Sequence, residues 1–147
     1  MSIIASIRDK IRFEVETALT AARTAGKLKF EEMPNFVVEV PREKAHGDFA
    51  VNVAMLLGKE AKTAPRLIAQ VIVGFLENKE GLIEKVEVAG PGFINFFLDK
   101  SWVYKVIPRV IKEDASYGCS EHGRGQKVQV EFVSANPTGL LHMGNAR

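Results

Sequence analysis

The sequence predicts an α+β protein in which helices pack on a small, mostly antiparallel sheet, followed by the opening of a second, α/β domain. Three observations carry this prediction. A long amphipathic pattern occupies residues 3–25, two β-rich runs flank a turn at residues 90–92, and a single strand pattern at residues 127–133 follows a glycine-rich stretch. One strand and the start of a helix cannot bury a core, so we expect residues outside this sequence to complete the second domain.

The composition limits the classes to which this chain can belong. A hydrophobic content of 46% suits a globular protein with a real core. The 20 basic residues nearly balance the 18 acidic ones, so any contact with nucleic acid must come from a local patch and from shape. The single cysteine, Cys119, excludes an internal disulfide and fits a reducing compartment. With no apolar run near the ~18 residues of a membrane span, and no secretory signal, we expect a cytoplasmic protein without a membrane partner.

The first half of the chain reads as a helix, a strand and two further helices. Ser2 and Gly26 are suited to begin and to end the helix at residues 3–25, and residues 35–41 read as a strand closed by a proline. Asp48 is predicted to cap the first of the two shorter helices, and Thr63 is predicted to cap the second. Pro65 is tolerated in the first turn of that second helix.

The second half contains a hairpin, a helix and a linker. Runs at residues 83–88 and 93–98 predict the hairpin, and its Gly90-Pro91-Gly92 turn has a Pro-Gly step that suits type II geometry. Residues 101–114 are helical by pattern, with Pro108 bending the helix. Residues 115–126 hold three glycines and no apolar run, which is typical of a linker.

The last segment has a strand, a turn and the start of a helix, in the order typical of a nucleotide-binding site. The strand at residues 127–133 leads through a turn-rich stretch into the start of a helix near His142. The first amides of such a helix have no partner and its dipole favours negative charge. Gly144 lacks a side chain, so a phosphate can approach the backbone there. This arrangement suits the phosphates of ATP.

Residues 131–147, EFVSANPTGLLHMGNAR, resemble the stretch around the HIGH signature of class I aminoacyl-tRNA synthetases, in the form found in arginyl-tRNA synthetases. Two earlier segments agree. HGDFAVNVAMLLGKEAKTAPRLIAQVI, residues 46–72, resembles the His-Gly-Asp segment of that family's N-terminal additional domain, and VEVAGPGFINFFL, residues 86–98, resembles its hairpin. The resemblance implies ATP-dependent activation of L-arginine to arginyl-adenylate, with Mg²⁺ accompanying ATP, and transfer to tRNA(Arg). It also implies a monomeric full-length enzyme, of which this chain alone is an inactive fragment.

The resemblance also implies how the chain divides. Residues 1–114 would be the additional domain, which contacts the outer corner of tRNA around the D-loop. Residues 115–126 would be the linker, and residues 127–147 the start of a Rossmann-like catalytic domain. The HIGH-like motif would comprise Ala135, Asn136, Pro137, Thr138, Gly139, Leu140, Leu141, His142, Met143, Gly144 and Asn145.

Residue roles follow from the same resemblance. His142, Gly144 and Asn145 would bind ATP, and His142 and Asn145 would be catalytic, with His142 stabilising the charge on the phosphates. Asn145 stands where the family usually has a second histidine: it either donates a hydrogen bond to phosphate or only fills the helix surface. The arginine pocket would hold a carboxylate and amide oxygens suited to a cationic amino acid, from Glu131, Ser134 and Asn136.

Structural roles compete with these functional ones. Glu131 is alternatively a solvent-facing carboxylate at the end of a strand. The His46-Gly47-Asp48 segment is interpreted as structural, and Cys119 with His122 supplies too few ligands for zinc. The aromatic residues of the hairpin are expected mostly in the core, although one exposed ring could stack on an unpaired base; they are Phe93, Phe96 and Phe97.

Two other functional classes stay open. One is a free-standing RNA-binding module without catalysis, which a reading frame continuing past residue 147 would exclude. The other is a different nucleotidyltransferase with a His-x-Gly step, which an ATP–pyrophosphate exchange test with arginine and tRNA would distinguish.

Overall fold

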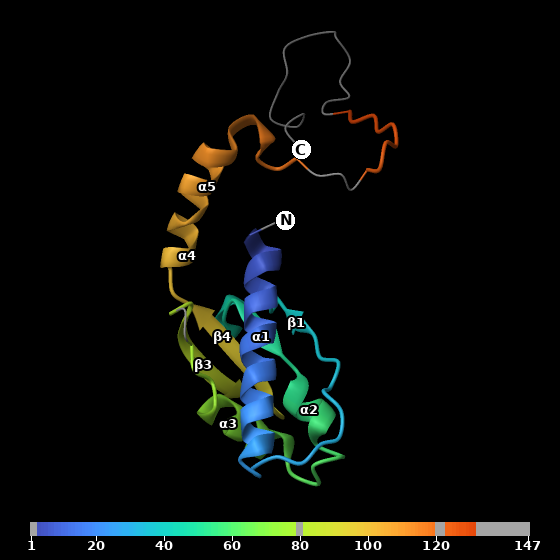
Figure 1. The fold of residues 1–147 in the computed structure, drawn as a ribbon, viewed down its shortest axis with the longest axis vertical. Helices are drawn as coiled ribbons and strands as arrows, with labels where there is room; N and C mark the ends of the chain where they lie inside the picture. The colour runs from blue at the N-terminus through green and yellow to red at the C-terminus, as the bar shows by residue number, and fades with distance from the viewer. Residues whose placement is uncertain (1–2, 79–80, 120–122, 132–147) are drawn as a thin grey trace. The chain divides into compact units, whose positions relative to one another are not determined.

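The structure, a computed structural model, describes residues 3–78, 81–119 and 123–131 (Figure 1). The chain divides into two units, residues 1–117 and 118–147. The elements of the first unit are α1 (Ile3–Thr24), β1 (Val38–Glu39), the short 3₁₀ turn η1 (Lys44–His46), β2 (Phe49–Val51), α2 (Val53–Leu57), α3 (Pro65–Gly74), β3 (Ile83–Ala89), β4 (Phe93–Leu98), α4 (Ser101–Tyr104), α5 (Val106–Glu113) and η2 (Asp114–Ser116).

The predicted α+β class is confirmed by a sheet of four antiparallel strands in the order β1-β2-β4-β3. Figure 1 shows α1 lying across one face of this sheet, with α2 and α3 beside it. Opposite residues of antiparallel strands share a face. Phe49 pairs with Phe96, and Val51 with Ile94, so these four side chains turn together toward the helices and are buried there.

Helix α1 forms because its apolar residues recur on one face, as predicted. Its buried side chains are Ile7, Ile11, Val15, Ala18, Leu19 and Ala22. Gly26, with φ of 69°, ends the helix: its N–H donates to the Arg23 carbonyl, and the Lys27 N–H donates to the Ala22 carbonyl, both at 2.9 Å. This pair of bonds is the Schellman arrangement, so the predicted role of Gly26 is confirmed. Ser2 lies outside the described residues.

The strand expected at residues 35–41 is shorter than predicted, because α1 competes for its backbone. The Arg12 guanidinium donates to the Phe36 carbonyl at 2.9 Å and lies 4.9 Å from the centre of the Phe36 ring. That carbonyl is therefore bound to α1 and not to the sheet. Only Val38–Glu39 pairs with β2.

Both predicted helix caps are wrong. The helix that Asp48 was expected to cap begins only at Val53, because residues 49–51 form β2 instead. A continuous apolar run fits a buried strand as well as a buried helix. The Thr63 hydroxyl donates to the Ala61 carbonyl at 2.9 Å and does not cap α3. Pro65 does occupy the first turn of α3, as predicted.

The predicted hairpin is confirmed, but its turn is of another type. The Gly92 N–H donates to the Ala89 carbonyl at 3.2 Å, so the turn begins at Ala89. Its second position is Gly90, with φ of 51°, where the type II prediction placed Pro91. The turn packs against α3: a Cβ added to Gly92 would lie 2.9 Å from the Pro65 Cβ.

The predicted effect of Pro108 appears as a break between α4 and α5. Proline has no N–H to donate to the carbonyl four residues earlier, which is that of Tyr104, the last residue of α4. At the start of α4, the Ser101 N–H donates to the Asp99 carboxylate at 2.9 Å. Hydrogen bonds from the side chain and backbone of Ser101 hold the pKa of the Asp99 carboxyl below its usual value.

The second unit has no strand in its described part. Residues 127–131 are unpaired, so the strand predicted at 127–133 does not form over the residues that the structure describes. A strand needs a neighbour for its backbone groups, and Val128 and Val130 remain 75% and 63% exposed. The α/β opening of a second domain stays a prediction. No helix among the described residues has both the length and the apolar character to cross a bilayer.

Candidate nucleic-acid interface

The sheet face opposite the helices carries a cleft. Successive pairings place Glu39 beside Ala50, Ala50 beside Asn95, and Asn95 beside Glu87, so one row of side chains crosses this face. The cleft has a volume of about 380 Å³ and lies between the loop at residues 41–46 and the hairpin turn; its lining residues are Glu39, Pro41, Arg42, His46, Ala50, Ala89, Gly90, Pro91, Phe93 and Asn95.

Asn95 is the polar side chain that distinguishes this cleft. It is 4% exposed and is the one buried polar residue among those that the structure describes. Its side-chain amide makes no hydrogen bond with another described residue. Among the described residues, no polar side-chain atom is both fully buried and without a hydrogen-bond partner. The Asn95 amide has no partner, so it is not fully buried and it still reaches the cleft. Because this amide makes no hydrogen bond within the domain, its donor and its acceptor are both available to a ligand that enters the cleft.

An aromatic ring, a guanidinium and an imidazole accompany this amide. Phe93 lies two residues before Asn95 on the same strand and is half-buried at the cleft. Arg42 and His46 line the other side and are exposed. A ring for stacking, an amide for a base edge and a cation for a phosphate together suit an unpaired nucleotide. The structure therefore presents a candidate site for single-stranded RNA.

Gly47 and Asp48 attach the loop of the cleft to β4. The Asp48 N–H donates to the Phe96 carbonyl at 2.9 Å, and the Asp48 carboxylate accepts from the Leu98 N–H at 2.8 Å. Gly47 has φ of 87°, and a Cβ there would lie 2.6 Å from the Phe96 carbonyl oxygen. The predicted structural role is thus confirmed for Gly47 and Asp48, although Asp48 attaches the loop to β4 instead of capping a helix.

Replacing Asp48 by alanine is expected to lower the free energy of unfolding by about 1–2 kcal/mol, the contribution of a hydrogen bond to a carboxylate that is open to solvent. Urea unfolding of the chain would measure this loss. Asp48→Asn is the matched control, because its amide oxygen still accepts from Leu98 and most of the stability should return. Equal losses for the two variants would contradict the assigned hydrogen bond.

The remaining predicted site residues lie elsewhere. Glu131 is exposed in an unpaired segment of the second unit, and no described residue of the expected arginine pocket accompanies it. The other predicted site residues lie outside the described residues; they are Ser134, Ala135, Asn136, Pro137, Thr138, Gly139, Leu140, Leu141, His142, Met143, Gly144 and Asn145. Cys119 is exposed, and the described residues contain no group of three possible metal ligands.

Sequence reasoning missed Asn95, although a signal was present. The stretch Phe-Ile-Asn-Phe-Phe places one amide among apolar residues on a strand whose two faces are both largely covered. A polar residue in such a strand is expensive unless it has a partner or a function. By contrast, the sequence did predict that one aromatic ring of the hairpin could stack on a base, and Phe93 fits this prediction. Phe96 is fully buried, and the Phe97 ring already lies 5.0 Å from the Lys85 ammonium.

Comparisons with known proteins agree with this fold. A family model described as the arginyl tRNA synthetase N terminal domain matches residues 6–98. An arginine–tRNA ligase of Moorella thermoacetica is 52% identical over 147 residues, which is 100% of this chain and 26% of that protein. One of Desulforamulus reducens is 54% identical over 145 residues, with 99% and 26% covered. The chain thus spans about a quarter of the length of the curated relatives that it matches.

A solved structure, the arginyl-tRNA synthetase of Plasmodium falciparum, superposes with a TM-score of 0.57 at 18% identity. The superposition covers 71% of this chain and 18% of that one, and at this identity it supports the fold alone. The family match covers more than half of the chain and includes every strand of the sheet. The chain belongs to the arginyl-tRNA synthetase family, and its residues 6–98 are the N-terminal domain of that family.

Proposed function

We propose that this chain is the N-terminal part of an arginine–tRNA ligase, an enzyme that activates L-arginine with ATP and transfers it to tRNA(Arg). The observation that carries the proposal is the identity of 52–54% with proteins of that name over nearly the whole chain. The alignment covers residues 131–147 as well, where the HIGH-like resemblance lies. We place the full-length protein in the cytoplasm as a monomer.

The proposal assigns catalysis to the second unit and RNA contact to the first. Residues 127–147 would open the catalytic domain after a linker at 115–126. There, Glu131, Ser134 and Asn136 would hold arginine, while His142, Gly144 and Asn145 would hold ATP with its Mg²⁺. A carboxylate and amides suit a guanidinium, and a helix start suits phosphates.

Residues 1–114 would contact tRNA through the cleft. Phe93 would stack on one unpaired base, and the Asn95 amide would both donate to and accept from its edge. Arg42, at the exposed side of the cleft, would meet the adjoining phosphate. The chain as a whole carries a formal charge of only +2, so binding would depend on this local arrangement and not on a general attraction to RNA.

The activity is tested by ATP–pyrophosphate exchange with the full-length protein in the presence of tRNA. Exchange should require arginine and should not occur with lysine, whose ammonium cannot form the paired hydrogen bonds of a guanidinium. Exchange driven by another amino acid, or none with arginine, would contradict the proposal.

Replacing Asn95 by leucine should separate RNA binding from folding. We expect the KM for tRNA of the full-length enzyme to rise roughly ten- to hundredfold, which corresponds to two lost hydrogen bonds of about 1 kcal/mol each. The melting temperature should stay the same or rise, because the amide has no partner inside the domain. Phe97→Leu is the control, since Phe97 lies on the same strand and face but does not line the cleft. A stability loss without any change in tRNA binding would show that Asn95 has only a structural role.

A further inference from the structure

Helices α4 and α5 expose an apolar face that the rest of the first unit does not cover. No residue of α5 is buried, and Ile107 and Ile111 are 58% and 74% exposed. Residues three and four apart on a helix share a face, so Val110 joins these two in one stripe, which Val103 and Tyr104 of α4 extend. We call these five residues the α4–α5 face; they are Val103, Tyr104, Ile107, Val110 and Ile111.

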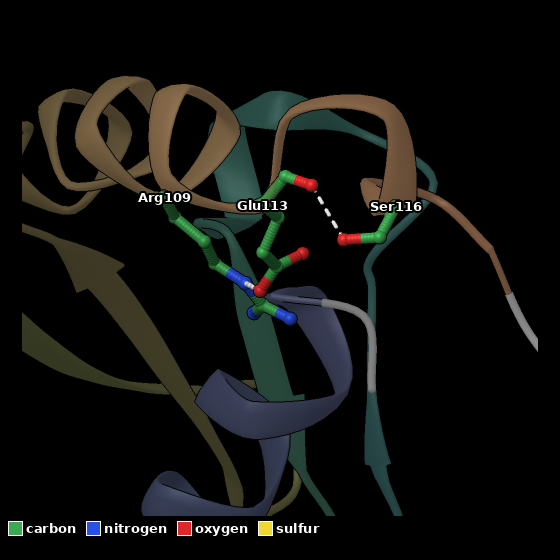
Figure 2. A network of polar contacts seen from close by, with 3 residues as sticks. All are labelled: Arg109, Glu113 and Ser116. Atoms are coloured by element: carbon green, nitrogen blue, oxygen red, sulfur yellow. Dashed lines mark hydrogen bonds and ion pairs between the residues drawn. The ribbon is translucent and has the colours of Figure 1, made fainter.

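Helix α5 does not turn its apolar side toward the core of the first unit, as a surface helix ordinarily does. Arg109 and Glu113 are only 33% and 35% exposed in their side chains, and the Arg109 Nε lies 2.6 Å from a Glu113 carboxylate oxygen. Figure 2 shows this pair, with the Ser116 hydroxyl donating to the Glu113 carbonyl. An isolated domain would place the ion pair in water and the isoleucines inside. The observed orientation therefore indicates that a further surface covers the isoleucines.

The core of the first unit cannot supply that surface. Its buried cluster comprises residues between Ile7 and Leu98, and from α4 and α5 only Trp102 packs against it. Helix α5 contacts mainly its neighbours α4 and η2. The core is complete without the α4–α5 face, so the partner must come from elsewhere.

We propose that the α4–α5 face docks on the part of the full-length enzyme that follows residue 147. The relatives are about four times as long as this chain, which covers 26% of them, so most of the protein lies beyond it. The docking surface would be apolar at its centre. This inference rests on the proposed function, because it requires the full-length chain.

The size of the face favours an attached partner over a free one. Five side chains cannot supply the ~800 Å² per partner that a standard interface between separate proteins buries. A segment on the same chain needs less area, because a short linker raises its effective concentration to about the millimolar range. RNA is disfavoured, since the centre of the face carries no cation and RNA binding depends on phosphate contacts.

The test compares the 147-residue chain with the full-length enzyme. Ile111→Cys and Lys112→Cys are each placed in a Cys119→Ser background, and the alkylation rate of the new thiol is read by mass spectrometry of its peptide. At Ile111→Cys the rate should be at least tenfold lower in the full-length enzyme, whereas at Lys112→Cys it should be similar in both proteins. Hydrogen exchange of residues 106–113 in the unsubstituted proteins is the second measurement, and it should be slower in the full-length enzyme.

Three results would overturn the inference: equal rates at Ile111→Cys in both proteins, protection that grows with protein concentration, or protection that appears only when tRNA is added. The second would indicate a second copy as the occupant and the third RNA. Arginine-dependent pyrophosphate exchange is measured on the same samples. An active enzyme with an unprotected thiol would overturn the docking alone, whereas a protected thiol without arginine activation would overturn the proposed function and support the docking.

Discussion

Replacing His142 by alanine in the full-length enzyme is expected to lower kcat for arginine activation by roughly 10²- to 10³-fold, the usual loss for one preorganised donor. Charge grows on the phosphates as the adenylate forms, and a histidine at the start of the helix would meet that charge. Its contribution belongs mainly to the transition state, so the KM for ATP should change far less than kcat. Pyrophosphate exchange at varied ATP concentration measures both quantities.

Asn136→Ala serves as the comparison for His142→Ala. It should mainly raise the KM for arginine, because Asn136 is proposed to contact the substrate before and during the reaction. Asn145→His separates the two roles of Asn145: it should alter the rate only slightly if the amide already donates to phosphate, and should raise it several-fold if the amide is surface filler. A His142→Ala enzyme that stays folded and activates arginine near the wild-type rate would contradict the proposed ATP site.

Gly47→Ala is expected to lower the free energy of unfolding of the first unit by about 3–5 kcal/mol. Two costs combine there. The backbone of Gly47, with φ of 87° and ψ of −171°, lies in a region that residues with a Cβ rarely adopt. The added methyl group would also lie 2.6 Å from the Phe96 carbonyl oxygen. This oxygen accepts from the Asp48 N–H and cannot move away without breaking that bond. Urea unfolding measures the loss.

Gly26→Ala provides the matched control. Gly26 also has a positive φ, of 69°, but a Cβ there would meet nothing within 4 Å. Its cost should be limited to the conformational term of about 1–2 kcal/mol. If both variants lose the same stability, then the close approach of Gly47 to β4 contributes nothing, and the loop is held by Asp48 alone.

Sequence patterns predicted correctly those elements that are held together by contacts between residues close in the sequence. The α1 stripe and Gly26 were read correctly because their interactions lie within a few residues, and the hairpin because its strands are adjacent in sequence. Asp48 was assigned to the wrong element because its carboxylate bonds to Leu98, 50 residues away. No pattern near Asp48 contains that partner, and the apolar run after it fits helix and strand equally well.

Only part of the candidate site could be predicted from the sequence, for a related reason. A ring available for stacking could be anticipated from the aromatic residues of the hairpin. The importance of Asn95, in contrast, depends on which strands lie beside β4. Its neighbours Ala50 and Glu87 come from different parts of the chain. The arginine and ATP residues form a further class, because their placement depends on strands that the described residues do not include; they remain predictions.

The two walls of the cleft differ in how freely their shape can change. The hairpin turn is locked against α3, where Gly92 has no room for a Cβ beside Pro65 and the Arg66 guanidinium donates to the Gly90 carbonyl at 3.4 Å. The opposite loop is fastened mainly at its end, by Gly47 and Asp48, and its residues from Arg42 to Ala45 are exposed. Insertions and exchanges there would cost the domain little stability. The fold thus supplies one rigid wall and one variable wall, and under the proposed function a new nucleotide preference would arise most easily through the variable loop.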